Sequence, residues 1–424
     1  MRLPAVVVVL FFIVGCAVNP VTGERQLSLV DEGWELQTGE QYYAPLRQSQ
    51  GGDFVLDPDL VAYVKEVGQR VAAEADRELP YEFEVINSSV PNAWALPGGK
   101  ISINRGLLTE MGSEAELAAV LGHEVVHAAA RHSAHAQSRA VLTQGAVILG
   151  GIAVGVATER EDYATVAMLG GMLGAQLVSQ RYSRNAEREA DYYGMIYMDR
   201  AGYDPQGAVD LMESFLRLSE GRDPGFMAGL FASHPPSRER VENNQRTLAE
   251  LGAGGEVGRD RYQQAIARIT ELKPAYKAHD EGRLALAQGN YDRALAKAEE
   301  ALAMEDGEAV FHALKGDALA SSDRHAEAES AYSAALARDN TWFYHHLRRG
   351  MVRERQDNLS GARGDLQASL ERLETAEGHF FLGNVERASG NRQQAIQHYR
   401  TAAQSDTDTG QRARQALADM GVEQ

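Results

Sequence analysis

The sequence predicts a mainly α-helical protein, in which an α+β domain with a small sheet is followed by a solenoid of α-helical repeats. Three observations support this fold class. Apolar residues recur at helical spacing in several segments, short segments before residue 105 alternate as β-strands do, and glycines recur every 33 or 34 residues near the C-terminus. At 424 residues, the chain is long enough for two or three domains.

The composition narrows the class of protein. Hydrophobic residues make up 44% of the chain and charged residues 24%, which is usual for a folded soluble protein. The net charge of −18 argues against nucleic-acid binding, because phosphate contacts require clustered Lys and Arg. Cys16 is the single cysteine of the sequence, so an intramolecular disulfide is impossible.

Residues 1–15 are typical of a lipoprotein signal peptide, because their apolar run is too short to span a bilayer. The four residues that end at Cys16 resemble the bacterial lipobox, in which the chain is cut before a cysteine that then carries acyl groups. We expect lipidation of Cys16 and a lipid-tethered segment over residues 16–52. A plain signal peptide or an uncleaved anchor is the alternative. The residue after the cysteine is Ala17 and not Asp, which resembles the pattern of lipoproteins sent to the outer membrane of Gram-negative bacteria.

A short sheet is predicted before residue 105. Alternation predicts a strand at residues 81–85, and the turn residues 97–99 join two further short β segments. Such a sheet can offer a free edge to an extended peptide. A hairpin that only closes the fold is the alternative.

The segment from His123 to His127 reads His-Glu-Val-Val-His. On a helix, His123 and His127 lie one turn apart on the same face, about 6 Å from each other. Two imidazoles so arranged can bind one tetrahedral Zn²⁺, and Glu124 can reach a water molecule on that metal. Three fixed residues in five also occur by chance on buried helices, so the motif needs support from elsewhere in the chain.

The helix that carries this motif is predicted to begin at a capping box, Ser113 and Glu116, and to run toward Arg139. Two more histidines follow the motif. We expect His132 to face elsewhere in a structural role and His135 to lie on the surface.

Residues 142–178 are unusually apolar and rich in glycine. Each half of this segment is too short to cross a membrane. The composition favours a packed helical hairpin, and a surface that contacts a membrane or a substrate is the alternative.

A charged helix is predicted to begin near residue 183, and two of its carboxylates share one face. Glu187 and Asp191 lie four residues apart, so one can complete a His-His-Glu zinc set while the other hydrogen-bonds to a ligand imidazole. Glu189 is expected to face away from this pair. A solvated charged helix is the alternative.

Together these segments resemble metallopeptidase family 48, a gluzincin family that includes the CaaX prenyl proteases. The resemblance rests on the motif at His123, on the later carboxylate pair, and on residues 92–99 and 233–235. It implies a zincin-like metallopeptidase domain over residues 53–250 that binds one Zn²⁺ per chain. It also implies that the zinc ligands are His123, His127 and Glu187, that Glu124 is the general base, and that Asp191 is a further carboxylate of the catalytic set.

His234 matches a family histidine that approaches the metal. It can act in catalysis by donating a hydrogen bond to the oxyanion. It can also occupy the open metal position and hold the enzyme inactive. A plain surface histidine is the alternative.

The C-terminal part is predicted to form about four tetratricopeptide repeats over residues 271–410, after a glycine-rich linker over residues 251–270. Four repeats exceed the number that a stable solenoid needs. Basic residues gather between residues 345 and 355, where they form either a lining for an acidic partner peptide or a solvated face. The small residues that recur are Gly282, Gly316, Gly350 and Gly383, followed at twelve residues by Ala294, Ala328, Ala362 and Ala395.

These observations predict a zinc endopeptidase of the periplasm that is lipid-anchored through Cys16 and does not bind nucleic acid. Its repeat domain is expected to bind a protein partner. The resemblance implies cleavage of misfolded or stalled outer-membrane proteins, with outer-membrane assembly machinery as the partner of the repeats. The alternative is a repeat scaffold or holdase whose peptidase is latched or vestigial.

Overall fold

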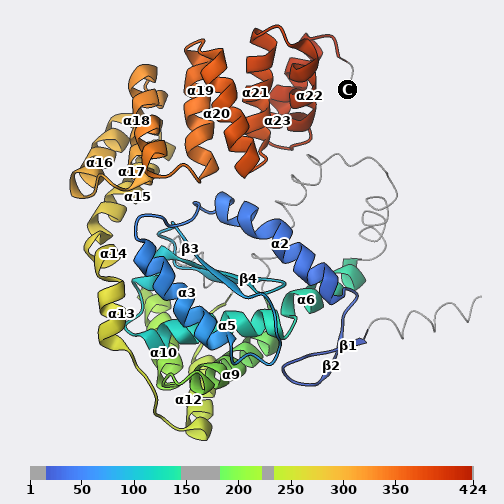
Figure 1. The fold of residues 1–424 in the computed structure, drawn as a ribbon, viewed down its shortest axis with the longest axis vertical. Coiled ribbons are helices and arrows are strands. Elements are labelled where there is room, and N and C mark those ends of the chain that lie inside the picture. The colour runs from blue at the N-terminus through green and yellow to red at the C-terminus, as the bar shows by residue number, and fades with distance from the viewer. Residues whose placement is uncertain (1–15, 145–181, 222–233, 423–424) are drawn as a thin grey trace, which may run out of the picture. The chain divides into compact units, whose positions relative to one another are not determined.

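The computed structural model describes residues 16–144, 182–221 and 234–422 (Figure 1). The predicted signal peptide and most of the apolar segment 142–178 lie outside the described residues. No helix in the described ranges is both long enough and apolar enough to cross a membrane. The chain forms two compact units. Of the described residues, the first unit contains 16–44, 57–144, 182–221 and 234–267, and the second contains 45–56 and 268–422.

The first unit contains a three-stranded sheet with the strand order β3-β5-β4. Its strands are β3 (Glu82–Ile86), β4 (Ala93–Leu96) and β5 (Lys100–Asn104). β5 pairs in parallel with β3 and antiparallel with β4, so the predicted hairpin is confirmed and β4 lies at an edge of this sheet. Gly98 and Gly99 have φ angles of 78° and 84°, a conformation that favours residues without a Cβ atom. A separate antiparallel pair joins β1 (Cys16–Val18) to β2 (Arg25–Leu27).

Helix α5 (Glu114–Ala129) carries the His-Glu-Val-Val-His motif, and Ser113 caps its start as predicted. The prediction of one helix toward Arg139 is wrong. Arg131 adopts a left-handed conformation with φ of 63°, which ends α5, and α6 (His132–Gln144) begins directly after it. The Arg131 guanidinium pairs with Glu35 and donates to the carbonyl oxygen of Val30 at 3.0 Å, and these contacts hold the break in place.

Further helices complete the first unit, and the predicted linker over residues 251–270 contains two of them. Tyr262 is fully buried in that stretch, and its hydroxyl donates to the carbonyl oxygen of Leu108 at 2.6 Å. Much of this stretch therefore packs as part of the first unit. The further helices are α2 (Glu32–Ser49), which extends into the second unit, α3 (Pro58–Ala72), α4 (Arg105–Leu108), α9 (Arg184–Arg200), α10 (Gln206–Gly221), α12 (Arg238–Leu251), α13 (Arg259–Ala265) and α14 (Ala267–Glu271), which also reaches the second unit.

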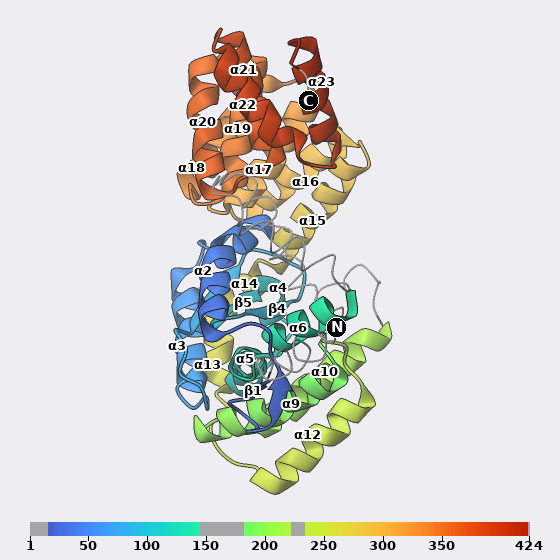
Figure 2. The same ribbon diagram turned by 90° about the vertical axis from the view of Figure 1, so that its right-hand side faces the viewer.

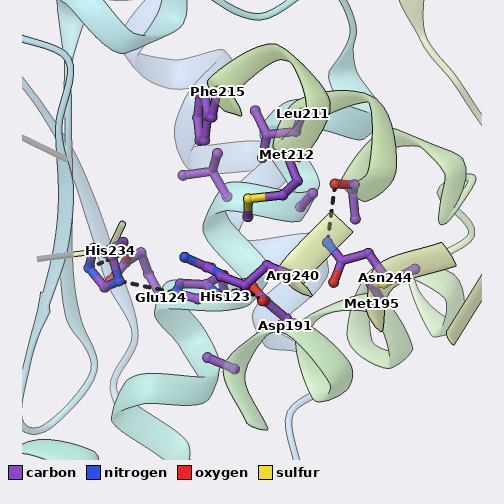
Figure 3. Close-up of a pocket in the computed structure, with 14 residues that line it drawn as sticks. His123, Glu124, Asp191, Met195, Leu211, Met212, Phe215, His234, Arg240 and Asn244 are labelled. Atoms are coloured by element: carbon purple, nitrogen blue, oxygen red, sulfur yellow. Dashed lines mark hydrogen bonds and ion pairs between the residues drawn. The ribbon is translucent and has the colours of Figure 1, made fainter. Parts of the chain in front are cut away.

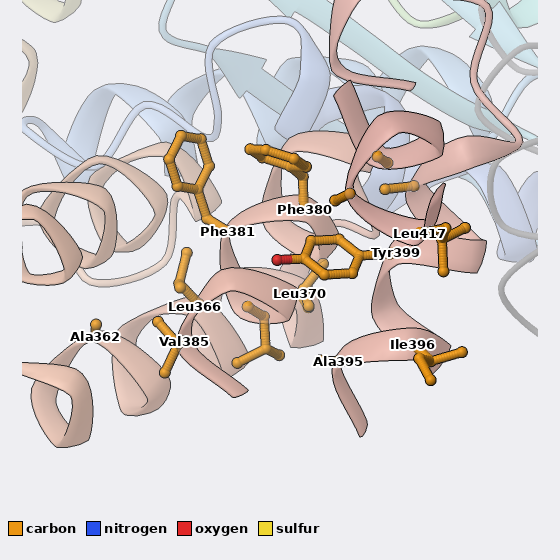
Figure 4. Close-up of a cluster of buried hydrophobic side chains, with 14 of the residues drawn as sticks. Ala362, Leu366, Leu370, Phe380, Phe381, Val385, Ala395, Ile396, Tyr399 and Leu417 are labelled. Carbon is orange, nitrogen blue, oxygen red and sulfur yellow. The ribbon is translucent and has the colours of Figure 1, made fainter. Parts of the chain in front are cut away.

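The second unit is a stack of antiparallel helix pairs (Figure 2). A Cβ atom on Gly316 would lie 2.6 Å from the ring of Tyr332, so the first helix of that repeat packs directly against the second. Figure 4 shows the apolar core that the last repeats share, around Phe380 and Tyr399. The helices are α15 (Lys273–Ala287), α16 (Tyr291–Met304), α17 (Ala309–Ser321), α18 (His325–Arg338), α19 (Phe343–Arg355), α20 (Leu359–Arg372), α21 (Ala376–Ala388), α22 (Arg392–Ala403) and α23 (Asp408–Asp419).

Three arginines of α19 form neither an open lining nor a plain solvated face. Arg348 lies 2.9 Å from Asp317 of α17, and Arg349 lies 2.7 Å from Asp365 of α20. Arg353 also pairs with Asp365, at 2.9 Å. These arginines connect α19 to α17 and α20. The carboxylates that they contact, Asp317 and Asp365, are buried.

Candidate metal centre

The metal-ligand candidates are brought together by two helices that cross at a pair of glycines. A Cβ atom on Gly122 of α5 would lie 3.0 Å from the carbonyl oxygen of Gly194 on α9. A Cβ atom on Gly194 would lie 3.0 Å from the amide nitrogen of His123. Because neither glycine has a side chain, the two helices approach closely, and Glu187 near the start of α9 meets the motif on α5.

Four ligand atoms, one each from His123, His127, Glu187 and His234, all lie within 4.8 Å of one another. The Nε2 atoms of His123 and His127 are 3.0 Å apart, and Nδ1 of His234 lies 3.2 Å from Nε2 of His123. Glu187 Oε1 lies 3.0 Å from Nδ1 of His234 and 3.4 Å from Nε2 of His127. Ligand atoms at zinc-bonding distance in a tetrahedron are about 3.3 Å apart, so these residues fit a tetrahedral zinc site.

The charges around these atoms also suit a divalent cation. Counted as ionised, Glu124, Glu187 and Asp191 carry three negative charges and Arg240 carries one positive charge, so one divalent cation balances the group. Burial lowers the pKa of His123, but contacts with Asp191 and Glu187 outweigh burial and raise that pKa to about 10. The negative potential that favours a proton on His123 equally favours a metal cation.

Asp191 and Arg240 support His123 from the side away from the cluster. Asp191 Oδ1 lies 3.0 Å from Nδ1 of His123, which leaves Nε2 of that ring facing the other ligand atoms. Arg240 of α12 donates to both carboxylate oxygens of Asp191 at 2.7 Å and lies 3.1 Å from Glu187. Burial raises the pKa of Asp191, but the Arg240 guanidinium outweighs burial and lowers that pKa. Sequence analysis missed Arg240, because no local pattern marks it.

Glu124 is buried beside the ligand atoms. Its Oε1 lies 3.7 Å from Nε2 of His234, and its Oε2 has no hydrogen-bond partner among the described residues. Burial raises the pKa of Glu124, and the nearby His234 and His123 partly oppose that rise. A buried carboxylate oxygen without a partner, next to a candidate metal site, is well placed to accept a proton.

The prediction that His132 faces elsewhere is wrong, whereas Glu189 makes its contacts away from Glu187 and Asp191, as expected. The break at Arg131 turns His132 back toward the motif, so that its Nδ1 lies 2.8 Å from Nδ1 of His127. Glu189 Oε1 lies 3.3 Å from Nε2 of His132. Tyr182 stacks on the His127 ring, with 3.9 Å between centroids. The contacts of His132 depend on the break at Arg131, so no local sequence pattern predicts them.

A largely apolar pocket borders the candidate metal centre (Figure 3). It lies between α5, α9, α10 and α12, and His123, Glu124 and Arg240 line its polar side. This combination can hold an apolar side chain close to a polar reacting group. The apolar lining includes Met195, Leu211, Met212 and Phe215.

Comparison with known proteins agrees with this geometry. The model of peptidase family M48 matches residues 58–247, and a tetratricopeptide-repeat model matches residues 279–341 and 347–409. The chain is 29% identical to the β-barrel assembly-enhancing protease of Escherichia coli K12 over 236 residues, which cover 55% of this chain and 47% of that protein. It is 30% identical to the mitochondrial metalloendopeptidase OMA1 of Schizosaccharomyces pombe over 260 residues, which cover 61% of this chain and 73% of that protein.

The chain thus spans about half the length of the bacterial relative and almost three quarters of the yeast relative. The family model covers the helices that supply His123, His127 and Glu187, as well as His234. The chain therefore belongs to peptidase family M48 and carries tetratricopeptide repeats after its peptidase domain.

Proposed function

We propose that this chain is a zinc endopeptidase of the cell envelope that hydrolyses peptide bonds in misfolded or stalled outer-membrane proteins. The observation that carries the proposal is the group of four ligand atoms at tetrahedral spacing beside Glu124, whose Oε2 has no hydrogen-bond partner in the described part of the chain. The substrate class follows the name of the bacterial relative, a protease that enhances the assembly of β-barrels.

The chemistry assigns a distinct task to each side chain. Zinc, when bound by His123, His127 and Glu187, would lower the pKa of a water ligand toward about 7 and polarise the scissile carbonyl. Glu124 accepts a proton from the attacking water and passes it to the leaving nitrogen. Asp191 keeps the His123 ring in the orientation that binds metal.

Substrate binding is proposed to use the edge strand and the apolar pocket. In the described sheet β4 pairs on one side with β5. The residues of β4 are buried, so an extended peptide adds along its other side only once that edge is uncovered. The same peptide can place an apolar side chain in the pocket lined by Met195 and Phe215. This arrangement suits unfolded chains, because a folded protein rarely presents an extended segment.

A second candidate function is a repeat scaffold or holdase with a latched peptidase, and the position of His234 favours it. Catalytic zinc sites keep one position open for water or substrate, whereas four protein ligands close the shell. Nδ1 of His234 lies among the other three ligand atoms. In the latched state His234 takes the position that the attacking water needs, and the ring must leave before cleavage begins.

A cleavage assay with unfolded barrel protein or casein tests both functions. We expect Glu124→Gln to keep stoichiometric zinc and to lose cleavage by about 10²–10⁴-fold, since the proton acceptor is removed and the ligands remain. Glu78→Gln, an exposed carboxylate in the same unit, is the matched control and should cleave normally. Cleavage by Glu124→Gln at the control rate would reject the mechanism. His234→Ala should cleave faster if the histidine is a latch and more slowly if it stabilises the oxyanion.

The proposed location is the periplasmic side of the outer membrane, with Cys16 as the lipid anchor. The proposal rests on the lipobox-like sequence before Cys16 and on the name of the bacterial relative. Wild type should incorporate labelled palmitate in cells, and Cys16→Ala should not. Equal labelling of both, or labelling of neither, would reject the anchor.

The repeats are proposed to bind a protein partner, with the outer-membrane assembly machinery as the first candidate. Stacked helix pairs of this kind provide extended surfaces for peptides and proteins. A pull-down from envelope extract with the Glu124→Gln chain should recover this machinery, and loss of the repeats from the chain should abolish its recovery. Equal recovery with and without the repeats would reject this assignment.

A further inference from the structure

The N-terminal segment contacts a residue near the candidate metal centre that does not line the pocket. Asn19 follows β1 and is buried, with 3% of its surface exposed. Its Oδ1 accepts a hydrogen bond from the amide nitrogen of Val21 at 2.9 Å, which fixes the orientation of the amide group. Its Nδ2 then donates to Glu189 Oε1 on α9 at 2.6 Å.

The contacts continue from Glu189 to a candidate zinc ligand. Glu189 Oε1 lies 3.3 Å from Nε2 of His132, and Nδ1 of His132 lies 2.8 Å from Nδ1 of His127. A glutamate carboxylate is ionised at neutral pH, so Glu189 can accept from both Asn19 and His132. Asn19, Glu189, His132 and His127 therefore form one continuous series, which we call the Asn19 series.

The Asn19 series has a consistent direction of hydrogen-bond donation when His127 binds a metal. A metal at Nε2 of His127 leaves the ring proton on Nδ1, so His127 donates to Nδ1 of His132. The proton of His132 is then on Nε2, which faces the Glu189 anion. Asn19 supplies a second donor to the same carboxylate. Nε2 of His132 lies at ion-pair distance from Glu189 without the geometry of a hydrogen bond, whereas the other contacts of the series are hydrogen bonds.

We propose that Asn19, Glu189 and His132 are positioning residues that fix the His127 ring for metal binding, so that the N-terminal segment contributes to metal affinity. This inference rests on the proposed zinc site. It gives the two histidines of the motif separate supports, since Asp191 holds His123 directly and the Asn19 series holds His127. Because Asn19 lies three residues after Cys16, the segment that is proposed to carry the lipid also supports the metal ligand.

Zinc affinity, measured by competition with a chelator, tests the Asn19 series. Loss of an outer partner of a metal ligand typically weakens metal binding by about 10–100-fold, so we expect a change of that size for His132→Ala and Glu189→Ala. Asn19→Ala should weaken binding in the same direction by less, because Glu189 keeps its contact with His132. Gln26→Ala is the matched control. Gln26 lies on the same hairpin and donates to Ala130, without touching the Asn19 series, so its zinc affinity should equal that of wild type.

A conservative variant separates positioning from folding. His132→Asn places an amide oxygen where Nδ1 of His132 lies, so it keeps an acceptor for His127 and should recover most of the affinity that His132→Ala loses. In Co²⁺-loaded protein, the visible absorption bands should shift in His132→Ala and return toward wild type in His132→Asn, whereas a role in folding alone would not order the spectra this way.

The zinc affinities distinguish failure of the Asn19 series from failure of the proposed zinc peptidase. If wild type binds zinc tightly and the folded variants at Asn19, Glu189 and His132 bind it equally well, the Asn19 series is rejected and the zinc peptidase stands. If wild type itself binds no zinc, the proposed function fails first. If His132→Ala does not fold, Glu189→Ala decides. A folded Glu189→Ala that binds zinc as tightly as wild type and Gln26→Ala rejects the inference.

Discussion

Replacing Arg240 with methionine removes the guanidinium that contacts both Asp191 and Glu187. Methionine keeps most of the length and apolar volume of the side chain, so the change removes charge more than packing. Arg240 is 8% exposed and makes two contacts of 2.7 Å with Asp191 and one of 3.1 Å with Glu187. Two carboxylates would then lie buried without their shared cation.

The size of the effect follows from burial. Two unit charges about 4 Å apart attract by about 4 kcal/mol at an effective dielectric constant of about 20, and loss of one partner of a buried pair costs about 3–5 kcal/mol. We therefore expect the free energy of unfolding of the chelator-treated protein to fall by about 3–5 kcal/mol in Arg240→Met. Zinc should restore part of this loss, because a divalent cation reduces the repulsion between Asp191 and Glu187.

Urea unfolding followed by circular dichroism measures the change, with and without zinc. Arg188→Met is the matched control, because Arg188 also pairs with a carboxylate, Glu239, but both side chains are about half exposed. Exposed pairs contribute about 0–1 kcal/mol, so the control should unfold almost as wild type does. A loss below about 1 kcal/mol in Arg240→Met, or one equal to that of Arg188→Met, would refute the charge balance described for the metal centre.

Two further predictions concern the repeats. His345 is fully buried, its ring nitrogens have no hydrogen-bond partner among the described residues, and burial lowers its pKa from 6.5 to about 3. The unfolded chain therefore gains a proton below pH 6.5 that the folded chain does not, so stability falls as the pH drops from about 6.5 toward about 3, by about 2 kcal/mol at pH 5. His345→Phe, which copies Phe311 of the preceding repeat, should remove that part of the acid sensitivity. The free energy of unfolding in urea, measured at pH 8 and pH 5, checks this. If the variant loses as much stability between the two pH values as wild type does, the prediction is contradicted. Gly316→Ala should destabilise the repeats by about 1–3 kcal/mol, because its Cβ atom would meet the Tyr332 ring at 2.6 Å. Gly364→Ala has open space around it and should stabilise them by about 0.5–1 kcal/mol. Thermal unfolding measures both changes, and shifts of equal sign would contradict the packing described for Gly316.

The parts of the site that the sequence could predict are those set by local geometry. His123 and His127 lie on one face of α5 because four residues make about one helical turn, and Glu187 and Asp191 share a face of α9 for the same reason. The repeats could also be predicted from the sequence, because glycines such as Gly316 recur at a fixed period. In each case one helix and its period contain all the information that the prediction needs.

The position of His132 could not be predicted in this way, because it depends on one backbone angle. Helical periodicity continues through Arg131, and an arginine rarely adopts a positive φ. The conformation depends on Glu35 and on the carbonyl oxygen of Val30, which lie about a hundred residues earlier in the chain. A long-range contact thus overrides the local pattern and turns His132 toward His127.

Arg240 also could not be predicted from local sequence, although the buried carboxylates of the site require a cation such as this one. Buried carboxylates need compensation, and a divalent metal bound by Glu187 leaves the charge of Asp191 and that of the proton acceptor Glu124 to be balanced in part by protein. The sequence contains many arginines, and no spacing rule connects α12 to α9. The structure selects Arg240 because Ser237 caps α12 just after His234, which directs the first turn of that helix at Asp191. The segment that delivers the fourth ligand atom therefore also delivers the cation, and displacement of His234 from the metal centre should disturb the Arg240 contacts as well.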